Sequence, residues 1–131
     1  MDQYIFDLKT GKWTNLQNTP TLWEEDASWS PDGARIVFMT NAGAPMDFND
    51  PNWFWQKRTR EFWTMDADSA HKQQLTCFNT PGASEYIPQG AIVANSAFSP
   101  DGKRLAGIVG VDYGTKDKAD FKLKIALIEF K

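Results

Sequence analysis

A stretch of twelve residues occurs twice in the chain and decides the predicted fold. Residues 27–38 read Ala-Ser-Trp-Ser-Pro-Asp-Gly-Ala-Arg-Ile-Val-Phe, and residues 96–107 read Ser-Ala-Phe-Ser-Pro-Asp-Gly-Lys-Arg-Leu-Ala-Gly. In each copy the proline presets φ, the aspartate accepts local hydrogen bonds and the glycine permits a positive φ, which favours a tight turn. Apolar segments flank both turns, so each copy is predicted to be a hairpin. The turn residues are Ser30, Pro31, Asp32 and Gly33 in the first copy, and Ser99, Pro100, Asp101 and Gly102 in the second.

A different hairpin pattern alternates with this one. Residues 4–16 contain the segment Tyr-Ile-Phe-Asp-Leu, a turn at residues 9–12 and the segment Trp-Thr-Asn-Leu. Residues 62–76 repeat the pattern with a turn at residues 67–71, and residues 124–130 contain its first half. Asp7, Asp66 and Glu129 take equivalent places in the three copies, and capping of a turn accounts for an acidic residue there.

The alternating hairpins predict four-stranded antiparallel units repeated in tandem. If the strands of one unit are named A to D, the chain reads C-D, then A-B-C-D, then A-B-C. The expected pairings are Ala27–Trp29 with Arg35–Met39, Ser96–Phe98 with Arg104–Ile108, and Phe62–Met65 with Gln73–Leu75. We therefore expect an all-β chain that forms a partial β-propeller of about two to three blades. The blades would be a half blade at residues 1–16, a full blade at 26–77 and an incomplete blade at 96–130.

The repeats resemble those of the TolB-like β-propeller family, relatives of the WD-repeat propellers. The resemblance rests on residues 29–38, on residues 62–68 and on the Gln-Leu-Thr of residues 74–76. It implies a non-catalytic scaffold that binds a protein, peptide or glycan, and it suggests a periplasmic or extracellular location. The alternative is the propeller portion of a larger serine hydrolase of the prolyl-oligopeptidase type, whose catalytic domain is outside this chain. The chain departs from the family at Ser69, where a turn glycine is usual.

Composition argues against several other functions. The net charge of -3 offers no basic stripe for phosphates, so nucleic-acid binding is not expected. No apolar run approaches the roughly 18 residues of a membrane span, and residues 1–3 do not begin a signal peptide. His71 and Cys77 are the only histidine and cysteine, too few for an ordinary zinc site or a Ser-His-Asp triad. Neither a cofactor nor a metal is expected.

The long connections between strands are where we expect a binding site. Because successive strands alternate in direction, the A-B and C-D turns emerge at one end of a propeller and the B-C and D-A connections at the other. The long connections, at residues 17–25, 41–60, 78–95 and 110–121, therefore share one face, and long loops on a rigid scaffold commonly bind ligands.

The connection at residues 41–60 has the richest composition. Its candidate ligand-binding residues are Asp47, Asp50, Trp53, Trp55, Arg58 and Arg60. In one interpretation Trp53 and Trp55 form a stacking platform, and Arg58 or Arg60 orients the ligand. In the other, which we favour, the aromatic residues pack as core. The oxygen-rich run at residues 47–52 suggests a calcium site as a third interpretation, although it lacks the glycine and distal glutamate of an EF-hand.

An isolated wedge of this kind leaves apolar sheet faces uncovered. We therefore expect these faces to be covered either by the rest of a longer propeller or by further copies of the chain in a ring.

Overall fold

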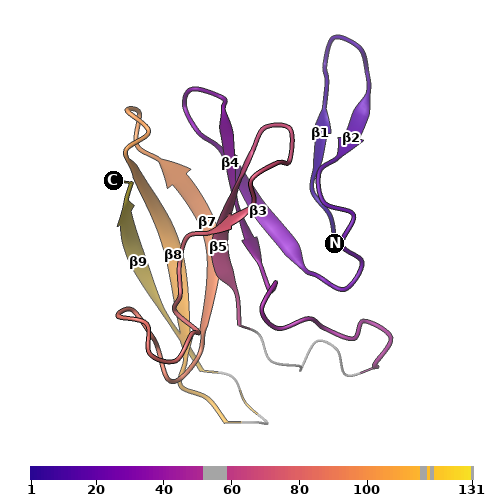
Figure 1. Cartoon of the computed structure of the whole chain (residues 1–131). Coiled ribbons are helices and arrows are strands. Elements are labelled where there is room, and N and C mark those ends of the chain that lie inside the picture. The colour runs from indigo at the N-terminus through magenta and orange to yellow at the C-terminus, as the bar shows by residue number, and fades with distance from the viewer. Residues whose placement is uncertain (52–58, 116–117, 119, 131) are drawn as a thin grey trace.

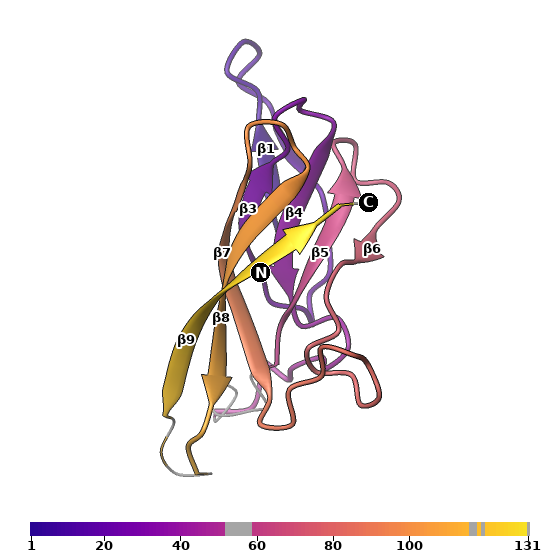
Figure 2. The ribbon, with the colours of Figure 1, turned by 90° about the vertical axis from the view of Figure 1, so that its left-hand side faces the viewer.

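The chain is all-β in the part that the computed structural model describes, which is residues 1–51, 59–115, 118 and 120–130. Three antiparallel sheets lie side by side: a β1–β2 hairpin, a central β3–β6 sheet and a β7–β9 sheet (Figures 1 and 2). This confirms the predicted fold class and the order of the strands. The strands are β1 (Tyr4–Phe6), β2 (Trp13–Asn15), β3 (Glu24–Trp29), β4 (Arg35–Thr40), β5 (Glu61–Asp66), β6 (Gln73–Gln74), β7 (Ala91–Phe98), β8 (Arg104–Asp112) and β9 (Phe121–Glu129).

The predicted strand pairs are all present. In the central sheet Trp29 lies opposite Ile36, and Trp63 lies opposite Gln74. In the third sheet Phe98 lies opposite Leu105. The three pairings predicted from the repeats are therefore confirmed.

The two Ser-Pro-Asp-Gly turns have the same hydrogen bonds. In the first, the Ser30 hydroxyl donates to Asp32 Oδ1 over 2.6 Å and accepts from the Arg35 amide over 2.9 Å. In the second, Ser99 makes the equivalent bonds to Asp101 and Arg104 over 2.5 and 3.0 Å. The turn glycines have φ values of 69° and 68°. These values lie in the left-handed region, which glycine adopts far more readily than other residues. The sequence repeat is thus a repeat of local structure.

β3 and β7, the first strands of their sheets, begin earlier than the sequence pattern predicts. We expected residues 78–95 to be a connection, but β7 already begins at Ala91 and pairs with the end of β8. A β-bulge explains the error, because the extra residue, Asn95, reverses the side-chain alternation within the strand. β3 has its bulge at the equivalent place, around Asp26. Both residues have positive φ, which aspartate and asparagine tolerate better than most residues.

Two apolar clusters hold the three sheets together. One lies between the central sheet and the β7–β9 sheet and contains Val37, Met39, Phe62, Val93 and Leu105. The other lies between the central sheet and the β1–β2 hairpin, with Leu16, Ile36, Phe38 and Met65 at its centre. Alternate residues of β4 enter different clusters, so the continuous apolar run at residues 36–39 is covered on both faces, as predicted.

Candidate binding face

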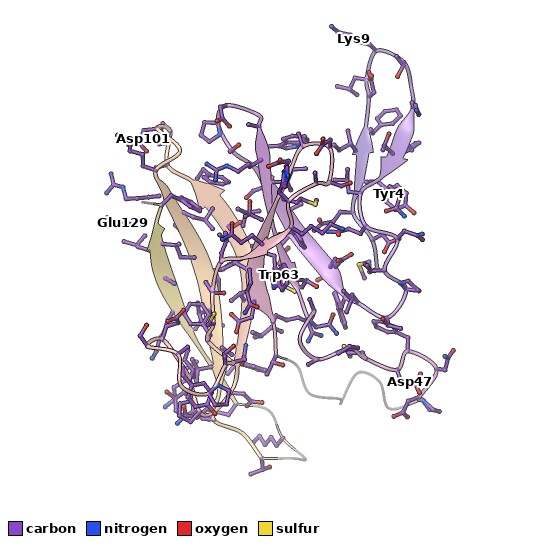
Figure 3. All side chains as sticks on the ribbon, in the orientation of Figure 1. Tyr4, Lys9, Asp47, Trp63, Asp101 and Glu129 are labelled. Atoms are coloured by element: carbon purple, nitrogen blue, oxygen red, sulfur yellow. The ribbon has the colours of Figure 1, made fainter. Side chains whose placement is uncertain are left out.

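The long connections emerge together at one end of the molecule. The connections after β2, β4, β6 and β8 lie at the lower end in Figure 1, and the tight turns lie at the upper end. In Figure 3 Asp47 marks the end with the long connections, whereas Lys9 and Asp101 mark the other. We call the lower end the long-loop face. The arrangement confirms the prediction made from strand parity.

Three of the predicted ligand-binding residues cannot be placed on this face. Trp53, Trp55 and Arg58 belong to the connection between β4 and β5 but lie outside the described residues. The choice between a stacking platform and a packed core therefore still rests on the sequence alone.

Arg60, another of the predicted ligand-binding residues, contacts two of the long connections. Its side chain is buried, with 2% of its surface exposed. The guanidinium donates to the Thr59 carbonyl over 2.8 Å and to Met46 Sδ over 3.2 Å. It also lies 5.2 Å from the centre of the Trp23 ring, a cation–π distance. Arg60 thus ties the β4–β5 connection to the β2–β3 connection, and its role in orienting a ligand stays a prediction.

Asp47 and Asp50 lie in a turn of the same connection. Asp47 is exposed, and its Oδ1 accepts a hydrogen bond from the Asn49 amide over 3.0 Å. The Asp50 amide donates to the Asp47 carbonyl over 3.2 Å. Within the described ranges no three of the His, Cys, Asp and Glu side chains gather as a metal site would require. Asp47 thus caps a local turn, and Asn52, the last residue of the run considered for calcium, lies outside the described residues.

A hydrogen-bond network that the sequence did not reveal organises the centre of the long-loop face. The buried carboxylate of Glu61, at the start of β5, accepts from the Thr76 hydroxyl over 2.6 Å. Its other oxygen accepts from the Asn79 amide over 2.6 Å and from Asn79 Nδ2 over 3.0 Å.

Asn79 extends this network to the next sheet. Its Nδ2 donates to the Ala91 carbonyl over 3.0 Å, and its Oδ1 accepts from the Ala91 amide over 2.7 Å. The asparagine side chain therefore binds both polar groups of the first residue of β7. Glu61 and Asn79 together fix the β6–β7 connection to two neighbouring sheets. No sequence motif marks them, because the partners are 12 and 18 residues apart.

A polar pocket opens beside this network. It has a volume of about 160 Å³ and is lined by Thr40, Asn41, Glu61, Trp63, Gln74 and Asn79, among other residues. The hydroxyl of Thr40 is buried and has no hydrogen-bond partner among the described residues. Hydroxyl, amide and carboxylate groups together with one indole suit a small polar group better than an apolar one.

A larger hollow of about 510 Å³ lies at the opposite end, between the two Ser-Pro-Asp-Gly turns. Its walls are the turn residues themselves, with Arg35, Lys103 and Phe130 beside them. The serine and aspartate side chains of these walls hydrogen-bond to each other within the turns. We therefore treat this hollow as a consequence of the repeat.

Two exposed tyrosines on the long-loop face were not predicted as site residues. Tyr86 is in the β6–β7 connection, and Tyr113 directly follows β8. The ammonium group of Lys122 lies 4.8 Å from the centre of the Tyr113 ring. Their position in long connections was the available signal, since tyrosine is frequent where proteins bind partners.

Glu24 and His71, both outside the pocket, have raised pKa values. Glu24, at the start of β3, is buried, and burial raises the pKa of its carboxyl although the Thr19 hydroxyl donates to it over 2.7 Å. His71 is exposed in the β5–β6 turn, which lies away from the long-loop face. Its Nδ1 is 2.7 Å from Asp66 Oδ2, and this hydrogen bond raises the pKa of the imidazole.

Asp7 caps its own turn, as the repeated acidic position suggested. Its Oδ1 accepts from the amides of Lys9 and Thr10 over 2.7 and 3.1 Å, which lowers the pKa of the carboxyl. The described residues contain no helix that is long and apolar enough to cross a membrane.

Comparison with known proteins supports the fold. No protein-family model matches the sequence, and no curated protein matches it. Among solved structures the chain is similar to TolB from Acinetobacter baumannii, with a TM-score of 0.52 and 20% identity. The match covers 96% of this chain but 25% of the TolB chain, so this chain spans about a quarter of that protein's length. The fold is therefore a TolB-like β-propeller fold, represented here by part of a ring.

Proposed function

We propose that the chain is a non-catalytic β-propeller scaffold that binds a protein, peptide or glycan on its long-loop face. The observation that carries the proposal is the segregation of the connections, with every long one at the end opposite the tight turns. The sheets hold these connections in place, and loops positioned by a rigid scaffold are the usual sites of recognition.

The exposed groups of the face suit this role. Tyr86 and Tyr113 offer flat apolar rings with a polar tip, which pack against peptide side chains and sugar rings alike. The pocket beside Glu61 and Trp63 would take a small polar group of the same partner, such as an amide or a sugar hydroxyl.

The position of the histidine argues against a histidine-dependent reaction in the pocket. His71 is in the β5–β6 turn, at the end opposite the pocket, and its imidazole is paired with Asp66. A base that serves the pocket would have to lie within hydrogen-bond reach of a bound substrate. The proposal for Trp53, Trp55 and Arg58 still rests on their place in the β4–β5 connection.

The test is a screen of the purified chain against a phage-displayed peptide library and a glycan array, followed by titration of the selected ligands. We expect Tyr86→Ala and Tyr113→Ala to weaken binding about 10-fold or more, as for aromatic residues at the centre of an interface. Leu8→Ala is the matched control, because Leu8 is exposed in the β1–β2 turn at the other end. Ligands whose affinity depends on Leu8 and not on either tyrosine would refute the proposal.

A further inference from the structure

The carboxylate of Glu61 is buried and has neutral partners. Its side chain is 8% exposed, and it accepts hydrogen bonds from the Thr76 hydroxyl and from the amide and side chain of Asn79. Among the described residues no ammonium or guanidinium group forms an ion pair with it. The guanidinium of the preceding residue, Arg60, lies against the Trp23 ring instead. A charge removed from water is costly unless it is paired, so a cation beside Glu61 would be favoured.

One acceptor site of this carboxylate is still open. Each carboxylate oxygen offers about two lone-pair sites. Oε1 of Glu61 accepts from the Asn79 amide and from Asn79 Nδ2, which fills both of its sites. Oε2 accepts from the Thr76 hydroxyl over 2.6 Å and has room for one more donor. A single donor can therefore bind to Oε2, whereas the two parallel donors of a guanidinium would need both oxygens.

The hydroxyl of Thr40 is a second polar group whose bonding is incomplete. Thr40 lies directly opposite Glu61 in the β4–β5 ladder, so the two side chains lie on the same face of the sheet. Thr40 is 1% exposed, and its Oγ1 has no hydrogen-bond partner among the described residues. Both residues line the pocket of about 160 Å³. An unpartnered hydroxyl and a carboxylate oxygen with an open acceptor site thus belong to one pocket.

Trp63 gives the same pocket an aromatic wall. It follows Glu61 by two residues on β5 and therefore lies on the same face. Its ring is half-buried and packs against the apolar cluster around Leu16. Among aromatic side chains the indole attracts a cation most strongly. The described lining of the pocket contains this ring and one carboxylate, and none of its residues is positively charged. The charge and the ring together favour a cationic group over a neutral one.

We propose that this pocket binds the ammonium group of a lysine side chain. The lysine belongs to a peptide partner of the long-loop face, so the proposal rests on the proposed function and narrows its small polar group to a cation. The ammonium donates to Glu61 Oε2 and to Thr40 Oγ1, and its last methylene groups lie against Trp63. Lysine is preferred to arginine because an ammonium is a compact donor, whereas the planar fork of a guanidinium suits a carboxylate with both oxygens open.

The test is an NMR titration of the isotope-labelled chain with blocked tripeptides that carry lysine, arginine or Nε-acetyl-lysine between two glycines. We expect the lysine tripeptide to shift the Thr40 methyl and Trp63 indole signals saturably at constant ionic strength. The arginine tripeptide should bind about 10-fold more weakly, and the acetylated one should not bind, because one or more charged hydrogen bonds are lost. Equal affinities for lysine and arginine would overturn the proposal. Sodium chloride alone producing the same shifts would overturn it too, in favour of an adventitious ion only.

Thr40→Val separates binding from folding. Because the Thr40 hydroxyl has no described partner, its removal should not lower the melting temperature. The affinity for the lysine tripeptide should fall about 10-fold, as expected when a hydrogen bond to a charged group is lost. Thr14→Val is the matched control, since Thr14 is exposed in β2 and does not line the pocket. An unchanged affinity in Thr40→Val would contradict the proposal.

Glu61→Gln removes the charge and keeps the size of the side chain. We expect saturable binding of the lysine tripeptide to be lost in this variant, and binding as tight as in the parent chain would overturn the proposal. Because Glu61 also holds Thr76 and Asn79, the melting temperature of the variant is measured first. If it has not folded, the comparison of Thr40→Val with the parent chain decides.

Failure of the lysine pocket is distinguishable from failure of the whole face. The library screen can yield ligands that depend on Tyr86 or Tyr113 while the lysine tripeptide leaves the Thr40 signal unshifted. The face then binds a partner, and the lysine pocket is overturned. If the tripeptide instead binds in a manner that depends on Thr40 while the screen yields nothing, the lysine pocket is supported and the wider proposal fails.

Discussion

The ring of Phe62 lies directly against the backbone of Gly107. A Cβ built at Gly107 would be 2.5 Å from both Cε2 and Cζ of the ring. Phe62 belongs to the central sheet and Gly107 to the next, so the contact fixes how closely the two blades approach. In the preceding interface the position equivalent to Gly107 is Phe38, which packs with Leu16. Each interface of the chain thus has its own distribution of large and small residues.

Gly107→Ala is expected to destabilise the chain by about 1–3 kcal/mol, because the new methyl group overpacks the interface. Urea unfolding of the variant measures the change. Gly43→Ala is the matched control, since a Cβ at Gly43 meets nothing within 4 Å. Gly107→Ala should reduce the free energy of unfolding less in a Phe62→Leu background than in the parent chain, because the smaller side chain leaves room for the methyl group. Additive effects of the two substitutions would show that the contact is not the cause.

The sequence predicted those parts of the fold that depend on local chemistry. The turns at Gly33 and Gly102 follow from residues next to each other, and the strand at residues 36–39 follows from a continuous apolar run. The start of β7 was missed because the bulge at Asn95 interrupts the alternation that defines a strand. The burial of Arg60 against Trp23 could not be predicted from the sequence, because it depends on a tertiary contact and not on the residue's polarity.

Glu24→Gln is expected to raise the melting temperature at neutral pH. Burial raises the pKa of the Glu24 carboxyl above the ordinary 4.5, in spite of the Thr19 hydrogen bond and the nearby charge of Lys72; Asp2 adds to the increase. The folded state therefore holds the proton more tightly than the unfolded state. The resulting stability is fully present below about pH 4.5 and is lost as the pH rises through the folded-state pKa.

Thermal unfolding between pH 4 and 7 checks this prediction. Glu24→Gln should flatten the decline of stability in the window that begins near pH 4.5, because glutamine keeps an acceptor for Thr19 without a charge. Glu25→Gln is the control on the next residue, which is not buried. A lower melting temperature for Glu24→Gln at pH 7 would mean that the ionised carboxylate is stabilising.

His71 is expected to titrate above its ordinary pKa of 6.5, because it is hydrogen-bonded to Asp66 and lies near the charge of Asp68. The contribution to stability is present below about pH 6.5 and is lost as the pH rises through the raised pKa. An NMR titration of the imidazole measures the shift, and Asp66→Asn should return the pKa towards its ordinary value. An unchanged pKa in Asp66→Asn would rule out the pair as its cause.

Asn79→Ala is expected to loosen the β6–β7 connection and to destabilise the chain by about 1–3 kcal/mol. The substitution removes the acceptor of the Ala91 amide at the start of β7 and one of the two donors to the Ala91 carbonyl, which keeps the Arg60 amide. It also deprives the buried Glu61 carboxylate of the donor Nδ2. A polar group that is left unsatisfied away from water carries its desolvation cost without compensation, and a charged group carries more.

Hydrogen exchange and denaturant unfolding of Asn79→Ala together separate the local effect from the global one. The amide of Ala91 should exchange faster in the variant, whereas amides in the Ser30–Gly33 turn, at the other end of the molecule, should exchange as before under conditions where local opening dominates. Asn49→Ala is the matched control, because Asn49 lies on the same face and its hydrogen bond to Asp47 is made by its backbone amide. Asn79→Asp should be worse than Asn79→Ala, since a second carboxylate would face Glu61. If Asn79→Asp were as stable as the parent chain, the hydrogen bonds from Nδ2 could not be what holds the two sheets and the long-loop face together.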